Sequence, residues 1–285
     1  MRRRLAVAFA LLASLAVAST AVAAAGQKVN FLAHCKVSRM APDDPIVFPG
    51  QPGRSHHHTF FGNRRIDAFS TYDSLVGGAT TCNRKGDTAA YWVPTLFLHG
   101  QAVRPSDAVV YYTLRQHTDV RPYPKGLKIV AGDAHAMSPQ SLKVTWWTCA
   151  APRVAHAAAR APRDCSRRAI LAHPRPHLVG PRLSQVGIQL HVRFPDCWDG
   201  RHLDSPDHKA HMAYSTNDRC PASHPVLVPS LILIVTYPIS SGRGVELASG
   251  GQLTGHADFI NAWRQPVLER IVRRCRMALP RCGRR

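Results

Sequence analysis

The chain has 285 residues, eight cysteines and a formal net charge of +20, most of which comes from arginine. Such a charge favours anionic partners, for example acidic polysaccharide, phosphate-rich wall polymer or anionic lipid. Alanine and arginine are also abundant in chains from GC-rich genomes, so the charge alone does not select a partner. No nucleic-acid-binding module is recognisable, which argues against a specific nucleic-acid partner.

Residues 1–25 have the three parts of a secretory signal peptide. A basic start at residues 1–4 precedes an apolar run at 5–17, and small residues at 21–25 suit cleavage. No apolar run reaches the roughly 18 residues that a transmembrane helix needs. We therefore expect a secreted protein, extracellular or wall-associated, with residues 26–285 as the mature chain. Without the three signal arginines, 34 basic residues face 17 acidic ones, a net charge of +17.

An even number of cysteines in an exported chain predicts disulfide bonds. No Cys-x-x-Cys pair is present, which argues against a zinc ribbon or a redox motif. Eight cysteines allow 105 pairings, and connectivity cannot be read from sequence. As a hypothesis, we pair the sequence neighbours: Cys35–Cys82, Cys149–Cys165, Cys197–Cys220 and Cys275–Cys282. The bond at 197–220 would restrain its loop by roughly 3 kcal/mol on the chain-entropy model.

The mature chain has the pattern of a mainly β protein. Residues 188–194 alternate apolar and polar side chains, which is the period of a half-buried strand. Strands are predicted at 91–99, 108–114, 127–131, 142–149, 186–194 and 226–237. The one convincing helix is 266–276, where Pro266 suits a first helical position and apolar side chains recur on one face. Its arginine-rich face indicates a solvated surface.

Residues 150–185 are rich in alanine, arginine and proline, with one acidic residue, Asp164. This composition predicts a long excursion between strands, with little structure beyond what a Cys149–Cys165 bond imposes. The length of the mature chain fits one large β domain or two small ones. We expect a single domain over 26–285, a β-sandwich or jelly-roll-like fold with long disulfide-braced loops and a C-terminal α-helix.

Residues 199–214 hold the densest group of side chains that titrate or bind metals. They include Asp199, Asp204, Asp207, His202, His208 and His211, with Cys197 and Cys220 on either side. Histidine titrates near neutral pH and is the commonest metal ligand. Two interpretations stay open: an active or metal site in a disulfide frame, or a surface loop whose polar groups cap turns. On a helical turn, His208 and His211 would share a face.

Other polar clusters lie at 55–58, 80–92 and 255–259. On an extended backbone, His56 and His58 point to one face and His57 to the other. Asp258 precedes the terminal helix, where it is either a site residue or a helix N-cap.

The clusters support two kinds of site. A divalent metal such as zinc would take ligands from His58, His208 and His211. His56 would be a further donor, His256 is an alternative to His211, and Asp207 or Asp258 would supply a carboxylate. A site without metal would pair a histidine base with an orienting aspartate. Its catalytic candidates are His208, Asp207, His56 and Asp258.

A series of motifs in order along the chain resembles one known family. The motifs include Asp44-Pro45-Ile46-Val47, Ser55-His56-His57-His58, Ala90-Tyr91-Trp92-Val93-Pro94, Phe194-Pro195-Asp196-Cys197-Trp198-Asp199-Gly200, Asp207-His208-Lys209-Ala210-His211-Met212-Ala213-Tyr214 and His256-Ala257-Asp258-Phe259. The chain thereby resembles DUF1996, a secreted bacterial and fungal domain of unknown function, whose fungal members sometimes carry carbohydrate-binding WSC modules. The resemblance implies a single extracellular domain and no particular reaction. The excursion at 150–185 and the tail beyond Cys275 depart from it.

The leading functional hypothesis is a secreted carbohydrate-active protein that acts on cell-wall or matrix polysaccharide. It would be a His/Asp-based or metal-dependent hydrolase or lyase, with an anionic or neutral polysaccharide or wall polymer as partner. One alternative is a non-catalytic wall- or glycan-binding module with aromatic contacts. Another is an extracellular metal-binding protein. Convergence of the histidines and aspartates in one pocket would separate a site from a binding module.

Overall fold

The computed structural model describes residues 28–115, 118–150, 157–166, 187–277 and 282. Two five-stranded antiparallel sheets make up most of the fold, which confirms the predicted mainly β class. Sheet I has the order β1 (Lys28–Cys35), β7 (Asp107–Arg115), β14 (Ser230–Tyr237), β10 (Ile188–Arg193) and β9 (Thr145–Cys149). Sheet II has the order β2 (Val37–Ala41), β3 (His58–Gly62), β4 (Ala90–Pro94), β16 (His256–Ile260) and β8 (Lys128–Gly132).

Smaller elements surround the two sheets. One ribbon has the order β12 (Met212–Ala213), β11 (Cys197–Trp198) and β13 (Val226–Leu227). Another has the order β15 (Val245–Leu247), β5 (Leu96–Leu98) and β6 (Gln101–Ala102). Within the described residues, the helices are α1 (Tyr72–Leu75) and α3 (Gln265–Met277).

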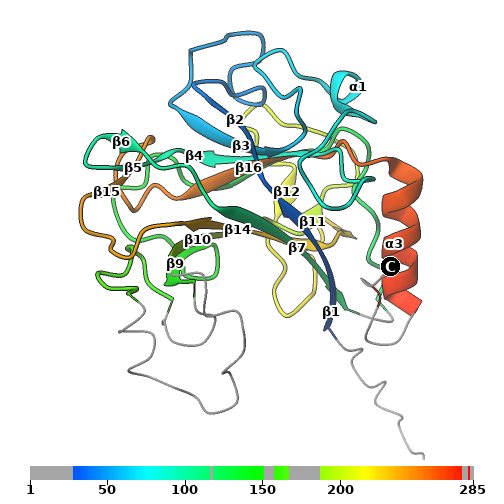
Figure 1. The fold of residues 1–285 in the computed structure, drawn as a ribbon. Helices are drawn as coiled ribbons and strands as arrows, with labels where there is room; N and C mark the ends of the chain where they lie inside the picture. Colours follow the sequence, from blue (N-terminus) through cyan, green and yellow to red (C-terminus); the bar gives the residue numbers. More distant parts are fainter. Residues whose placement is uncertain (1–27, 116–117, 151–156, 167–186, 278–281, 283–285) are drawn as a thin grey trace, which may run out of the picture.

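The two sheets pack as a sandwich around one shared core (Figure 1). Along β7 the side chains alternate between buried and half-buried, as expected for a strand with one face on a core. Val110 and Tyr112 of β7 belong to the same buried cluster as Tyr91 of β4 and Phe259 of β16. Each such side chain contributes roughly 1.5–3 kcal/mol by leaving water.

Sheet II is buried on both faces. On β3, Phe61 faces the shared core, so Phe60 and His58 must face the opposite side. A second apolar cluster covers that side and includes Phe60, Trp92 and Leu75 of α1. Every residue of β3, β4 and β16 is buried as a result. Polar side chains on the outer face of sheet II are therefore removed from water.

The comparison with the predicted elements is mostly favourable. Helix α3 confirms the predicted helix 266–276. The predicted strand 91–99 is divided at Thr95 into β4 and β5, and 226–237 is divided into β13 and β14. Strands β1, β2, β3 and β16 of the two sheets were not predicted, and neither were the short strands β6, β11, β12 and β15. The N-cap alternative for Asp258 is wrong, because this residue lies in the middle of β16.

All four predicted disulfides are present: Cys35–Cys82, Cys149–Cys165, Cys197–Cys220 and Cys275–Cys282. Four such bonds indicate an oxidising environment. In the parts of the chain that the structure describes, no helix has the length and apolar character to cross a membrane. The predicted signal peptide at 1–25 and most of the excursion at 150–185 lie outside the described residues. Within the excursion, Ala158 pairs with Trp147 of β9.

Candidate functional site

Three histidines from two distant parts of the chain converge at one end of sheet II. His58 begins β3, His256 begins β16, and β4 lies between these strands. His58 pairs with Pro94, and continuing the β4–β16 register brings His256 level with the same residue. His56 comes just before β3, and its ring centroid lies 4.2 Å from that of His58 and 5.0 Å from that of His256. One nitrogen from each ring lies within 4.8 Å of the others.

Backbone carbonyls orient two of these rings. His58 Nδ1 donates to the Asp43 carbonyl at 2.9 Å, and His256 Nδ1 donates to the Thr254 carbonyl at 2.8 Å. In the neutral ring, each Nε2 is therefore left with its lone pair. His58 is fully buried, and its Nε2 has no hydrogen-bond partner in the described structure. A histidine whose second nitrogen is tied to a carbonyl is the usual arrangement of a metal ligand.

The contact between His56 and His256 needs a proton or a cation. His56 Nε2 lies 3.1 Å from His256 Nε2. Because the His256 Nδ1 carries the hydrogen, its Nε2 can only accept in the neutral ring. His56 must then either donate a proton to it or share a cation with it. Two nitrogens on one tetrahedral zinc, each about 2.0–2.1 Å from the metal, are about 3.3 Å apart.

Two buried carboxylates join the histidines. Ligand atoms of Asp44, His58 and Asp258 also lie within 4.8 Å of one another. Asp44 follows β2, and its Oδ1 accepts from the amides of Ile46 and Val47. Among the described residues nothing bonds to the buried Asp258 Oδ2. A buried carboxylate oxygen without a partner is costly and needs an explanation.

We define the histidine–aspartate cluster as His56, His58, His256, Asp44 and Asp258. Burial lowers the pKa of His56 to about 4 and that of His256 to about 3. Burial also lowers the pKa of His58 well below its usual range. Burial raises the pKa of Asp44, and burial together with the neighbouring Asp44 raises that of Asp258 well above its usual range. The imidazoles are thus neutral at physiological pH, which is the form that binds metals.

Segment 199–214 borders this cluster. Lys209 Nζ donates to the Gly132 carbonyl at 2.7 Å, and its charge acts on both His256 and Asp258. His208 Nδ1 is 2.8 Å from Asp204, and the charge of His208 acts on Asp44. The segment therefore supplies groups to the edge of the cluster and not to its centre.

Most polar groups of segment 199–214 stabilise its own turns. Asp199 accepts from the amides of Arg201 and His202, and its Oδ2 lies 2.6 Å from the His202 ring. Asp207 Oδ1 accepts from the amides of Lys209 and Ala210. These contacts match the second interpretation of the segment, in which its polar groups cap turns.

His208 and His211 do not share a helical face, because no helix forms between 199 and 214. His208 instead has a left-handed backbone, with φ 57°. Both ring nitrogens of the buried His211 have partners within the protein. Nε2 donates to the Lys128 carbonyl at 2.7 Å, and Nδ1 lies 2.9 Å from the Ser205 hydroxyl.

The structure thus divides the residues that the sequence singled out. The candidates His56, His58 and Asp258 lie in the cluster, and His208 lies at its edge. Asp207 and His211 are occupied elsewhere, so the trio of His58, His208 and His211 is not brought together. Sequence reasoning named His256 only as an optional donor and gave Asp44 no role. His256 begins a strand that is buried throughout, and Asp44 follows the bulged strand β2, so neither residue stands in a periodic pattern. Asp44 does, however, open the first motif of the family resemblance.

The fold and this cluster define a disulfide-braced β-sandwich with a buried histidine–aspartate site. The family described as "Domain of unknown function (DUF1996)" matches residues 44–263. The chain therefore belongs to the DUF1996 family. The match runs from Asp44 to Trp263 and includes the whole cluster. No curated protein and no solved structure matches the chain at a significant level.

Proposed function

We propose that this protein is a secreted, metal-dependent hydrolase or lyase that acts on cell-wall or matrix polysaccharide. The observation that carries the proposal is the convergence of the three imidazoles of the cluster, two of them oriented by backbone carbonyls. Three protein ligands with room for a water or a substrate oxygen is the common pattern of a catalytic zinc site. Copper, nickel and iron accept the same ligands.

A divalent cation offsets the main cost of the cluster. Two carboxyl groups and two imidazoles are buried there with few hydrogen bonds, beside the half-buried His56, and buried polar groups without partners are expensive. Binding of the cation would give Asp258 Oδ2 and His58 Nε2 the partner that they lack. His56 is the most exposed of the three histidines, so substrate would approach from its side.

The chemistry that such a cation supplies is polarisation of an oxygen and activation of water near neutral pH. The protein would contribute the orientation of the ligands and their burial away from water. His208, at the edge of the cluster beside Asp44, is the group best placed to exchange protons with a bound substrate. The ammonium group of Lys209 would stabilise negative charge that develops on the substrate near the cluster.

The substrate class is supported by the predicted signal peptide and by the positive net charge of the mature chain. A secreted basic protein meets polymers of the wall and matrix, many of which are anionic. A protein that binds metal but turns over no polysaccharide would instead match the extracellular metal-binding alternative.

The proposal is tested on protein purified without a histidine tag. Elemental analysis should give close to one divalent ion per chain, and removal of the ion by a chelator should abolish turnover of wall polysaccharide. His56→Ala should lose both metal and turnover, because it removes one of the three imidazole ligands. The fold should stay in place, since His56 is only half-buried. His224→Ala is the matched control, since this histidine is half-buried like His56 and lies in a loop outside the cluster. Full turnover in metal-free protein would overturn the proposal.

A further inference from the structure

A polar cavity lies outside the histidine–aspartate cluster, because none of the residues of the cluster lines it. It has a volume of about 760 Å³ and lies against the ends of β7, β14 and β10 in sheet I. Loop 214–218, which belongs to the segment braced by Cys197–Cys220, forms another of its walls. Ligand sites commonly have volumes of roughly 300–1,000 Å³. The cavity is therefore large enough for a sugar unit.

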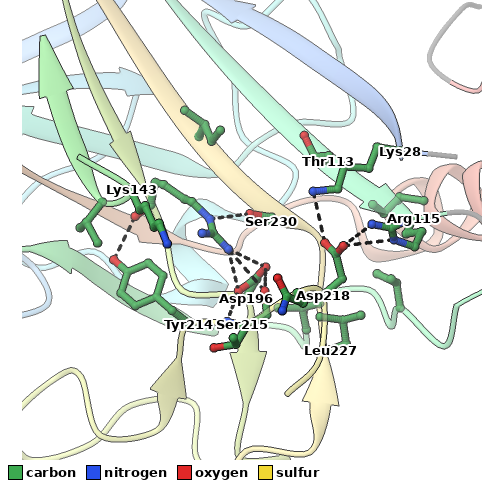
Figure 2. Close-up of a pocket in the computed structure, with 18 of the residues that line it drawn as sticks. Lys28, Thr113, Arg115, Lys143, Asp196, Tyr214, Ser215, Asp218, Leu227 and Ser230 are labelled. Carbon is green, nitrogen blue, oxygen red and sulfur yellow. Dashed lines mark hydrogen bonds and ion pairs between the residues drawn. The ribbon is translucent and has the colours of Figure 1, made fainter. Parts of the chain in front are cut away.

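Four cationic side chains and two carboxylates line the cavity, which leaves a formal charge of +2. Asp218 is neutralised by Lys28, at 3.4 Å, and by Arg115 (Figure 2). The buried Asp196 accepts from Arg193 at 3.2 Å and from the amide of Ser215 at 2.8 Å. Both carboxylates are thus engaged with the protein.

Lys143 stands apart from these ion pairs. It lies across the cavity from Lys28 and Arg115, beside Tyr214 (Figure 2). In the part of the chain that the structure describes, no acceptor bonds to its ammonium group. Arg193 is nearby and is held in place by Ser230 at 3.2 Å and by the ring of Tyr214, 5.6 Å from its guanidinium carbon. An anion that enters the cavity would meet an unpaired ammonium beside an oriented guanidinium.

The loop 214–218 has a conformation that its own backbone hydrogen bonds fix, without a ligand. Thr216 and Arg219 exchange two backbone hydrogen bonds of 3.0 Å, and the two residues between them have φ values of 53° and 60°. These are Asn217 and Asp218, the residue types that best tolerate a left-handed backbone in a tight turn. Hydroxyl groups of Thr113, Ser141, Thr216 and Ser230 line the cavity as well. Hydroxyls and an amide are the groups that bind the hydroxyls of a sugar ring.

We propose that this cavity binds an anionic sugar unit, with its acidic group at Lys143 and Arg193 and its hydroxyls along the Ser and Thr side chains. The acidic group can be the carboxylate of a uronic acid or the phosphate of a wall polymer. The site stands on its own residues and does not require a metal in the histidine–aspartate cluster. It would anchor the protein on an acidic polymer.

Calorimetric titration of the full mature protein at 0.15 M salt tests this site. The probes are a galacturonate tetramer, a glycerol-phosphate oligomer and a neutral glucose tetramer. At this salt concentration, long-range attraction by the whole basic protein is largely screened. One of the two anionic probes should bind, and which one binds identifies the source of the anion. The neutral tetramer should bind at least about tenfold more weakly.

Lys143→Met should weaken binding of the anionic probe at least about tenfold, the loss expected for one charge-assisted hydrogen bond. Lys125→Met is the matched control, because Lys125 is exposed and lies outside the cavity. It should bind as the wild type does. The proposal fails if neither anionic probe binds, or if Lys143→Met and Lys125→Met bind equally well.

Discussion

The histidine–aspartate cluster and segment 199–214 contain the same kinds of side chain in opposite circumstances. The segment gathers six histidines and aspartates within a short stretch of sequence, and its aspartates accept hydrogen bonds from neighbouring amides. The cluster gathers five from three parts of the chain, and two of its buried polar atoms have no partner among the described residues. In this protein, histidines and aspartates that are dense along the sequence form a well-capped loop, whereas buried nitrogen and oxygen atoms without partners indicate a site.

The largest expected difference between the two regions concerns metal binding. His256→Ala removes one of three imidazole donors and should weaken zinc binding at least about 100-fold, more than the loss of an orienting partner costs. His211→Ala, in segment 199–214, should leave zinc affinity unchanged and lower stability, because the buried His211 bridges Ser205 and Lys128. Competition titration with a chromogenic chelator measures both variants. An equal loss of zinc affinity in the two variants would contradict the claim that the cluster binds zinc and segment 199–214 does not.

Asp258→Asn tests whether a bound cation offsets the cost of burying the carboxyl group of Asp258. In metal-free protein this change should raise the free energy of unfolding at pH 7, because it removes a buried carboxylate without a full set of partners. In the presence of zinc the wild type should be the more stable of the two, because the variant should bind zinc about 10- to 100-fold more weakly. Chemical denaturation with and without zinc measures the effect. If Asp258→Asn destabilises the metal-free protein, the Asp258 carboxyl group does not cost stability there and is not a site that a cation completes.

His191 shows what burial does to a histidine that has a partner. Its Nε2 lies 2.8 Å from the Thr148 hydroxyl, and its ring stacks on Trp146 at 4.9 Å. Burial lowers the pKa of His191 to about 4, whereas the unfolded value is about 6.5. Above pH 6.5 both states are neutral, and between pH 6.5 and 4 only the unfolded state binds the proton. His191 should therefore reduce stability by up to about 3 kcal/mol as the pH falls through this range.

His191→Gln should remove this part of the acid sensitivity, since glutamine keeps a hydrogen bond to Thr148 and does not titrate. Denaturant midpoints at pH 7 and pH 4.5 measure the change. An identical loss of stability in wild type and variant would show that His191 is not the source. Zinc affinity at pH 7 should be the same in both, because burial alone does not make a metal site.

The smallest expected effect is that of Asp207→Ala. Loss of a turn cap of this kind costs about 1 kcal/mol. Thermal unfolding should record that loss, while metal content and turnover stay at the wild-type level. Asp207 was a catalytic candidate on sequence grounds, so a turnover defect without loss of stability would restore it to the active centre.

The sequence predicted the parts of the fold that follow a simple pattern. Strand β10 alternates along its length, α3 repeats every three to four residues, and the disulfides join neighbouring cysteines. Strands β3 and β16 were missed because sheet II is buried on both faces, which removes the alternation that reveals a strand. The cluster was found only in part for the same reason: His58 and His256 meet through the pairing of β3 and β16 with β4, and this long-range register leaves no local signal.

The central claim is that the cation binds at His56, His58 and His256 and not within segment 199–214. A crystal of untagged protein soaked in zinc, with diffraction recorded on both sides of the zinc absorption edge, locates the metal directly. We predict one anomalous peak within about 2.0–2.1 Å of a nitrogen from each of the three histidines. A peak between Asp204 and His208, or none at the three histidines, would contradict the claim.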